Sequence, residues 1–233
     1  MENIGIDGLG KLVLQIAEKL PVTIFVAALS FMFGLALGVV IALVRIKKRP
    51  VPYAIATLYV SFMRGTPALV QLFLIFYGLP QLLLLLNIDI NDWNVAIFAI
   101  ITFSLHIAAF LSEAIRSSYL AVGNGQLEAA YSIGLNDFQA LRLVMLPQVL
   151  NLSLPTLGNN ALILLKETSV AFTIGLVDIM GQAQVYLQIH YGMNMFGVYL
   201  LISLFYWLLC LAIERGVAYM EKRYAKIHIG LSR

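Results

Sequence analysis

Long apolar runs separated by short polar segments dominate the chain. The run from Val22 to Val44 contains no charged residue, and Asn94 to Leu111 and Met195 to Ile213 are apolar over a similar length. A helix of about 20 apolar residues crosses the hydrocarbon core of a bilayer. The pattern therefore predicts three uninterrupted transmembrane helices.

Two further runs are long enough to span a bilayer but contain polar interruptions. Val51 to Leu79 is interrupted by Arg64-Gly65-Thr66-Pro67, and Val149 to Val177 by Lys166-Glu167-Thr168-Ser169. The 233 residues are 61% hydrophobic and 12% charged, which is typical of a membrane protein rather than a soluble domain. We predict an all-α integral membrane protein with five transmembrane helices, at about 22–44, 51–79, 94–116, 149–177 and 195–214.

Basic residues predict the orientation of these helices. They cluster at 45–49 and 215–233, whereas the connections 80–93 and 178–194 contain no Lys or Arg. Because Lys and Arg that flank spans stay in the cytoplasm, we expect the N-terminus outside and the tail, 224–233, in the cytoplasm. Residues 1–21, despite Lys11 and Lys19, are expected to form a helical segment at the outer interface. The net charge of +3 follows from this topology and does not indicate a nucleic-acid partner.

Cysteine and histidine give no indication of a metal site. Cys210 is the single cysteine, and His106, His190 and His228 fall on different predicted elements. We therefore expect no internal disulfide, no metal and no bound cofactor, and we assign packed or surface positions to the imidazoles.

The one long hydrophilic connection, 117–148, has the sequence of a helical hairpin and faces the cytoplasm in this topology. Turn residues at 123–125 precede a short predicted helix at 126–133, with Glu128 in its first turn, where the helix dipole favours a carboxylate. Gly134 is placed to stop this helix. A loop built in this way indicates a docking element for a soluble partner.

The second half of the connection predicts another helix. Asn136 can cap it, with Gln139 three residues on in capping-box spacing, and Pro147 is expected to end or kink it. Ala129 and Ala130, in the first helix, are small enough to let a partner surface approach closely.

A family resemblance rests on the spacing within this hairpin. The pattern Glu-Ala-Ala, three residues, Gly, nine residues, an aliphatic residue, one residue and Leu-Pro resembles the coupling motif of permease subunits of bacterial ABC importers. Val occupies the aliphatic position, where Ile is usual. The motif is filled by Glu128, Ala129, Ala130, Gly134, Val144, Leu146 and Pro147.

Three other stretches resemble the polar amino-acid uptake permeases among these importers. They are Arg64-Gly65-Thr66-Pro67, Leu157-Gly158-Asn159 and Leu165-Lys166-Glu167-Thr168-Ser169, and the resemblance extends from about residue 21 to 223. It implies a type I ABC importer permease fold in the bacterial cytoplasmic membrane, with residues 22–223 as the permease domain.

The resemblance also implies partners. These are two ATP-binding subunits that hold ATP and Mg, a second permease chain, an extracytoplasmic binding protein and an amino-acid substrate. The sequence contains no Gly-rich phosphate loop followed by Lys and Ser or Thr, so the chain is expected to be a transport subunit and not an ATPase or another enzyme.

Charged residues within the spans are candidates for the substrate site, because each costs about 2.5–3.5 kcal/mol at the bilayer centre on insertion scales. Broken helices at this depth are where transporters hold polar substrates. The alternative is that Arg64, Lys166 and Glu167 only pair with one another or with helix ends and hold the bundle together. The candidates are Arg64, Gly65, Thr66, Asn160, Lys166, Glu167 and Ser169.

Two more observations refine this interpretation. Glu113 and Arg116, three residues apart near the end of a span, are expected to form an interfacial ion pair or a gate. Asn160 is neutral, whereas a carrier of arginine or lysine would favour a carboxylate there. We therefore expect a neutral or polar amino acid, and the stretch from Ala171 to Gly175 resembles cystine-type permeases.

Two other function classes remain as alternatives. A secondary transporter or channel would also carry interior charges, but five spans without an internal repeat do not form the inverted halves common in such carriers. Ser169 and Lys166 are spaced as a Ser-Lys nucleophile pair would be, but no oxyanion-binding group accompanies them.

Overall fold

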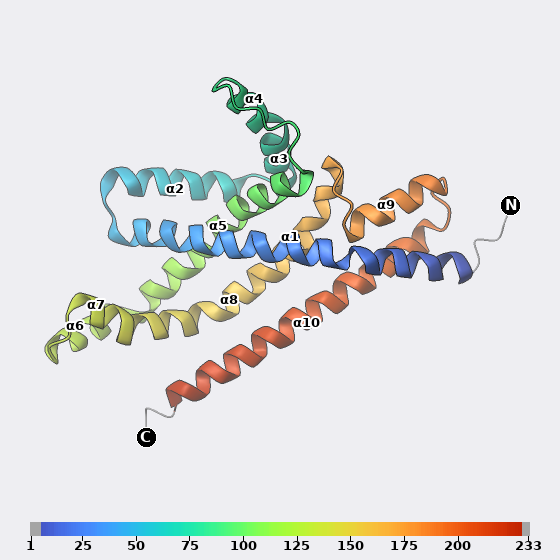
Figure 1. The fold of residues 1–233 in the computed structure, drawn as a ribbon. Coiled ribbons are helices and arrows are strands. Elements are labelled where there is room, and N and C mark those ends of the chain that lie inside the picture. Colours follow the sequence, from blue (N-terminus) through green and yellow to red (C-terminus); the bar gives the residue numbers. More distant parts are fainter. Residues whose placement is uncertain (1–5, 230–233) are drawn as a thin grey trace.

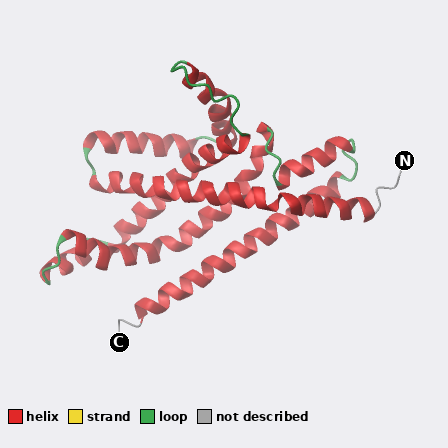
Figure 2. Ribbon diagram, in the orientation of Figure 1, coloured by secondary structure: helices red, strands yellow, loops and turns green. Residues whose placement is uncertain are grey.

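The computed structural model describes residues 6–229, and the side chains of residues 10–223, so the ends of the expected N-terminal segment (1–5) and tail (230–233) lie outside the described residues. The described part is helical and contains no strand, which confirms the all-α class (Figure 2). The elements are α1 (Ile6–Lys47), α2 (Pro50–Gly65), α3 (Ala68–Phe73), a π-helical segment (Leu74–Gly78), α4 (Leu79–Leu84), α5 (Val95–Val122), α6 (Gly125–Ser132), α7 (Asp137–Gln139), a second π-helical segment (Ala140–Met145), α8 (Leu146–Glu167), a 3₁₀ helix (Thr168–Ile174), α9 (Ile179–Ile189) and α10 (Met195–Ile229).

The long helices run between two ends of the molecule. The turn between α1 and α2, the α6–α7 hairpin and the C-terminal end of α10 lie toward one end, and α9 and the start of α1 lie toward the other (Figure 1). The predicted cytoplasmic segments thus share one end, the predicted outer connection 178–194 and the start of α1 lie toward the other, and α4 projects between them (Figure 1).

Four described helices are long and apolar enough to cross a membrane, and a fifth crossing requires the bent pair α2 and α3–α4. This pair bends by 112° between Gly65 and Ala68. Thr66 is extended because the ring of Pro67 disfavours helical geometry in the residue before it. The expected span 51–79 is therefore two helices that meet at a sharp corner rather than one interrupted rod.

Glycines set the close packing of α1 on α5. A Cβ added to Gly34 would lie 3.0 Å from the Ser104 carbonyl oxygen, and one on Gly38 would lie 3.1 Å from the Ala108 carbonyl oxygen. Small residues four apart are a common means of bringing two membrane helices together. This contact forms the centre of the bundle.

The N-terminal segment continues directly into the first span. No break occurs at Pro21, and α1 is one helix of 42 residues. Leu12 and Ile16 are fully buried against α9 and α10, beside Ile179 and Val198. The helix is thus continuous across residue 21, and the apolar face of its first turns is covered by the protein's own helices.

Asp178 joins α9 to α1 and α10. Its carboxylate accepts hydrogen bonds from the Gly181 N–H (2.9 Å), Thr23 Oγ1 (3.4 Å) and Tyr206 OH (3.5 Å). Asp178 lies outside the spanning helices and is 1% exposed, and burial raises its pKa to about 6.

Of the two predicted outcomes at Pro147, an end or a kink of the helix, the end does not occur. The helix from Asp137 continues through Pro147 into α8, and the π-helical segment Ala140–Met145 lies directly before Leu146-Pro147. The wider π turn removes the clash between the proline ring and the preceding turn. The same arrangement recurs where Leu74–Gly78 precedes Leu79-Pro80.

Candidate functional site

The first candidate region is the hairpin formed by α6 and α7. Helix α6 ends as the sequence predicts: Gly134 has φ +84°, the Gly134 N–H donates to the Tyr131 carbonyl (2.9 Å) and the Leu135 N–H to the Ala130 carbonyl (3.1 Å). These two bonds make a Schellman C-cap. Glu128 lies exposed in the first turn.

The start of α7 also has the predicted form. Asn136 Oδ1 accepts from the Gln139 N–H (2.9 Å), and the Asn136 N–H donates to Gln139 Oε1 (3.0 Å), which completes a capping box. The hairpin is therefore shaped by bonds between near neighbours in sequence.

The exposed surface of this hairpin contains several large apolar side chains. Ala129 is exposed, whereas Ala130 is 2% exposed and packs inside the hairpin, so only the first of the two alanines is open to a partner. Leu146 is 47% exposed and Pro147 is half-buried. The exposed large apolar side chains are Tyr131, Ile133, Phe138, Leu141, Leu143 and Leu146.

The second candidate region is an ion-pair cluster at the same end of the bundle. Glu113 pairs with Arg116 on α5, with Arg116 Nε 3.1 Å from Glu113 Oε2. Arg45 of α1 joins them, with its Nη1 2.6 Å from Glu113 Oε2. The sequence did not predict this role of Arg45, because a basic residue just after a span is also what the positive-inside rule expects on the cytoplasmic side.

A polar hollow of about 490 Å³ extends from this cluster along α2. Thr57, Ser61 and Arg64 line it at helical spacing, and the Arg64 guanidinium carbon lies 5.6 Å from the centre of the Phe110 ring. Arg45 Nε and Thr57 Oγ1 are buried without hydrogen-bond partners. The hollow therefore offers guanidinium and hydroxyl groups to an anionic ligand.

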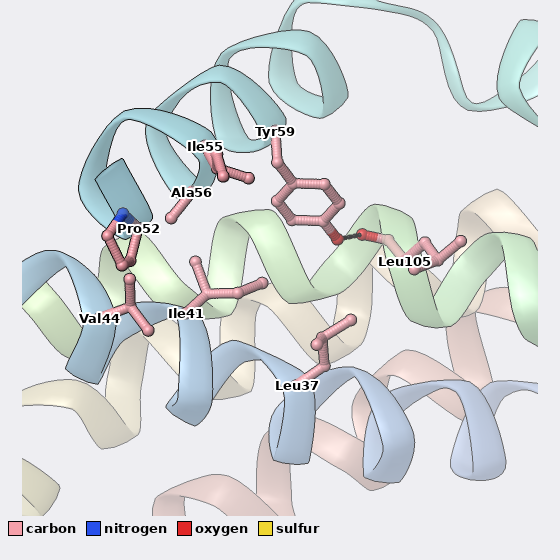
Figure 3. Close-up of a pocket in the computed structure, with 8 residues that line it drawn as sticks. All are labelled: Leu37, Ile41, Val44, Pro52, Ile55, Ala56, Tyr59 and Leu105. Atoms are coloured by element: carbon pink, nitrogen blue, oxygen red, sulfur yellow. Dashed lines mark hydrogen bonds between the residues drawn. The ribbon is translucent and has the colours of Figure 1, made fainter. Parts of the chain in front are cut away.

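A second hollow, of about 500 Å³ between α1, α2 and α5, has the opposite character (Figure 3). Its lining is aliphatic except for Tyr59, whose hydroxyl donates to the Leu105 carbonyl. It has no group to compensate the charges of a zwitterion, so the substrate site is not expected there.

The third candidate region is a buried chain of polar groups that joins α2, α3, α5 and α8. Thr66 Oγ1 donates to the Phe62 carbonyl (2.9 Å), and Gln71 Nε2 donates to Thr66 Oγ1 (2.7 Å). Gln71 Oε1 contacts His106 Nδ1 (2.8 Å), and His106 Nε2 lies 3.1 Å from Glu167 Oε2. We call Thr66, Gln71, His106 and Glu167 the polar chain.

The polar chain links two of the sequence motifs. Gln71 and His106 are 2% and 4% exposed, and the Glu167 side chain is 30% exposed. Thr66 belongs to the Arg-Gly-Thr-Pro corner, and Glu167 is the last residue of α8. The sequence predicted Thr66 and Glu167, the two ends of the polar chain, as candidate site residues. It predicted only a packed or surface position for His106, because nothing near residue 106 in the sequence indicates its partners.

The remaining predicted substrate residues are distributed more widely. Lys166 is exposed, and its carbonyl accepts from Ser169 Oγ (2.6 Å). Asn160 is buried, and its Nδ2 donates to the Thr156 carbonyl (2.9 Å) of its own helix. Arg64 and Gly65 line the hollow along α2, whereas Thr66 and Glu167 belong to the polar chain.

Comparison with known proteins agrees with this architecture. The family described as binding-protein-dependent transport system inner membrane component matches residues 34–226. The chain is 40% identical to the L-cystine transport system permease protein TcyL of Bacillus subtilis, over 94% of this chain and 90% of that protein. It is 41% identical to the probable amino-acid permease protein YxeN of the same organism, over 82% and 83%.

A solved structure has the same fold. The crystal structure of an amino acid ABC transporter with histidines superposes with a TM-score of 0.80 and 29% identity, covering 93% of this chain and 97% of that one. The type I importer fold and the membrane-spanning, non-enzymatic character follow from these matches. The chain thus belongs to the binding-protein-dependent transport system inner membrane components, as a multi-pass permease of the amino-acid ABC importer type.

Proposed function

We propose that this chain forms the translocation pathway of an ATP-driven amino-acid importer and that it carries a neutral or polar amino acid, with L-cystine as the first candidate. The observation that carries the proposal is the exposed apolar hairpin at one end of a bundle that also holds polar groups in its interior. The similarity to an L-cystine permease and the neutral Asn160 support the substrate class.

The substrate would contact both helix breaks. A zwitterion needs a cation for its carboxylate and an anion for its ammonium group. Arg64 would supply the cation beside the corner after α2, and Glu167 the anion where α8 changes into a 3₁₀ helix. The proposed substrate-binding residues are Arg64, Gly65, Thr66, Asn160, Lys166, Glu167 and Ser169.

The hairpin would couple transport to ATP hydrolysis. Glu128, Ala129 and Gly134 on α6 and Leu146 with Pro147 beyond it would face a groove on an ATP-binding subunit, and Ala130 would support α6 from inside. The complete transporter would contain two such subunits, which hold ATP and Mg, a second permease chain and an extracytoplasmic binding protein. The hairpin and the C-terminus would lie in the cytoplasm and the N-terminus outside.

The ion-pair cluster would act as a gate at the cytoplasmic end. The Arg45–Glu113 pair joins α1 to α5 beside the hollow, and Arg116 holds Glu113 from the same helix, so α1 and α5 cannot separate there without breaking the Arg45–Glu113 pair. A gate built from ion pairs opens at a modest cost when water enters, because water then solvates the separated charges.

The test is transport by the purified assembly. The tagged chain would be purified from its own cells together with its ATP-binding subunit and reconstituted into proteoliposomes, with its binding protein and labelled L-cystine outside and ATP inside. We expect uptake of labelled L-cystine to require ATP. We also expect unlabelled neutral amino acids to inhibit this uptake more strongly than arginine does. Uptake driven by an ion gradient without ATP would instead indicate a secondary transporter.

A further inference from the structure

We propose that His106 and Glu167 hold one proton between them, and that His106 is the internal counter-ion of Glu167 which the ammonium group of a substrate displaces. The first part rests only on the geometry of the polar chain. The second part rests on the proposed function and names a step in how the same site binds its substrate.

The orientation of the Gln71 amide is fixed by its neighbours. One end of the amide faces the Met63 carbonyl (2.9 Å), the Thr66 carbonyl (3.1 Å) and Thr66 Oγ1 (2.7 Å). Thr66 Oγ1 uses its own proton toward the Phe62 carbonyl, so it can only accept from Gln71. The end that faces three acceptors must be the NH₂ group, and Oε1 therefore faces His106.

This orientation fixes the position of one proton on the histidine. Oε1 only accepts, so the His106 Nδ1 atom 2.8 Å away must carry a hydrogen. In neutral imidazole, Nε2 would then be an unprotonated acceptor, and it lies 3.1 Å from Glu167 Oε2. If the carboxylate were also ionised, two acceptor atoms would lie 3.1 Å apart in a low-dielectric interior without a proton to bridge them. A second proton must therefore lie on Nε2 or on the carboxyl group.

Burial makes this proton hard to replace. Glu167 Oε2 is buried, and within the described residues it has no partner in hydrogen-bond geometry, so the imidazole 3.1 Å away can compensate it through charge rather than through an aligned hydrogen bond. A carboxylate without such a partner would be costly at this depth. The pair is thus either neutral imidazole with a protonated carboxyl group or imidazolium with a carboxylate. In both states the pair holds one proton more than neutral imidazole beside an ionised carboxylate would.

The other ionisable groups around the pair come from several elements. Arg64 of α2 lies over the ring of Phe110, whose centre is 5.0 Å from that of His106. Lys166 precedes Glu167 on α8 and is exposed, and Tyr59 donates to the carbonyl of Leu105, which precedes His106. Helix α1, which packs on α5, has no ionisable residue between Lys19 and Arg45. On α10, which packs on α8, Cys210 has both Lys166 and Glu214 in its surroundings. The cations around the pair are therefore Arg64 and Lys166, and Glu214 is an anion on the side of Lys166.

The partial exposure of Glu167 gives a substrate access to its carboxylate. Its side chain is 30% exposed, whereas that of His106 is 5% exposed. An arriving ammonium group pairs with the carboxylate, the Nε2–H bond breaks with its electron pair left on nitrogen, and the proton passes to water. His106 stays bonded to Gln71 through Nδ1–H. Substrate binding would therefore release one proton, and binding would tighten by up to about tenfold per pH unit as long as the pair is protonated.

The first arm of the test measures the pair without transport. Thermal unfolding of the purified permease–ATPase complex would be compared for wild type, His106→Gln, Glu167→Gln and the double variant. We expect His106→Gln to be the least stable, because it leaves the carboxylate without its counter-ion, and the double variant to recover most of the loss. His190→Gln, which removes a histidine at the end of α9, is the matched control. A double variant no more stable than His106→Gln would overturn the shared proton.

The second arm measures displacement with L-cystine and N,N′-diacetyl-L-cystine, which lacks the ammonium groups. Each would be titrated against the same complex, with the shift in unfolding temperature as the readout. We expect the half-saturating L-cystine concentration to fall about tenfold per pH unit in wild type and to be independent of pH in His106→Gln. Equal binding of the diacetyl compound, or the same pH dependence in both proteins, would refute displacement. If neither L-cystine nor any common amino acid bound, the proposed function would be contradicted. The shared proton of His106 and Glu167 would still be tested by the unfolding temperatures of the variants in the first arm.

Discussion

The hairpin and the polar chain differ in how their bonds relate to the sequence. In the hairpin, the cap of α6 and the capping box of α7 join residues three to five positions apart. In the polar chain, Gln71 and His106 are 35 positions apart and belong to different helices. Local bonds are encoded by spacing alone, whereas distant bonds exist only once the bundle has formed.

The two regions also differ in what they expose. The hairpin presents Ile133 and Phe138, which are 77% and 67% exposed, whereas the middle of the polar chain is almost completely buried. An exposed apolar surface is suited to a protein partner, and a buried polar chain is suited to a small polar ligand or to holding helices together. The following predictions test this division, from the largest effect to the smallest.

A change of charge on the hairpin should abolish coupling without unfolding the bundle. For Glu128→Lys combined with Gly134→Asp, we expect ATP-dependent uptake to fall about a hundredfold, which corresponds to about 2.7 kcal/mol. The reason is a reversed charge at the docking face and a Cβ at a backbone φ of +84°. Uptake in proteoliposomes measures the effect, and Ser132→Ala in the same helix is the control. Normal uptake by the double variant would rule out this hairpin as the coupling element.

Asp178 should make stability depend on pH. Burial raises its pKa to about 6 from an ordinary value of 3.8, so the folded chain binds a proton more tightly than the unfolded chain. The stabilisation from the protonated form is complete below about pH 4 and is lost as the pH rises through about 6, with a total of about 2–3 kcal/mol. Thermal unfolding in detergent between pH 4 and 8 measures it. Asp178→Asn should flatten this dependence, and an unchanged slope would assign it to other groups.

A single methyl group between α1 and α5 should destabilise the bundle. We expect Gly34→Ala to cost about 1–2 kcal/mol, since the new Cβ meets the backbone of α5 at Ser104 and the side chain of Ile107. Gly216→Ala in α10, where the Cβ meets nothing within 4 Å, is the matched control. Equal unfolding temperatures of the two variants would mean that α1 and α5 can move apart enough to accept the added methyl group without a loss of stability.

Loss of the α7 cap should have the smallest effect. Asn136→Ala removes the acceptor of the Gln139 N–H and one half of the capping box, at a cost of about 1 kcal/mol confined to the hairpin. We expect slightly weaker binding of the ATP-binding subunit and an unchanged unfolding temperature of the membrane helices. Asn136→Asp, which keeps an acceptor, should restore binding. A large fall in the unfolding temperature would show that the hairpin and the bundle fold as one unit.

The same division explains which features could be predicted from the sequence. Hydrophobic run length predicted the long helices, and Gly134, Asn136 and Gln139 predicted the hairpin bonds, because each signal lies within the segment whose structure it determines. The 112° corner was indicated only as an interruption, since Pro67 disfavours a straight helix but does not set the angle.

Two of the missed features depend on contacts between distant helices, and a third depends on local backbone geometry. The roles of His106 and Arg45 follow from Glu167 and Glu113 on other segments. The continuity of the helix through Pro147 depends on a π turn that the residue pattern does not reveal.

The length of α1 has a mechanical consequence. At 1.5 Å per residue, its 42 residues extend about 63 Å, about twice the thickness of the hydrocarbon core. Its start is buried against α9 and α10, its second half is held close to α5 at Gly34 and Gly38, and its end is tied to Glu113 through Arg45. A stiff rod that pivots at a point between its ends swings the two ends in opposite directions. Any tilt of α1 against α5 is therefore a lever motion that reaches both faces of the membrane at once.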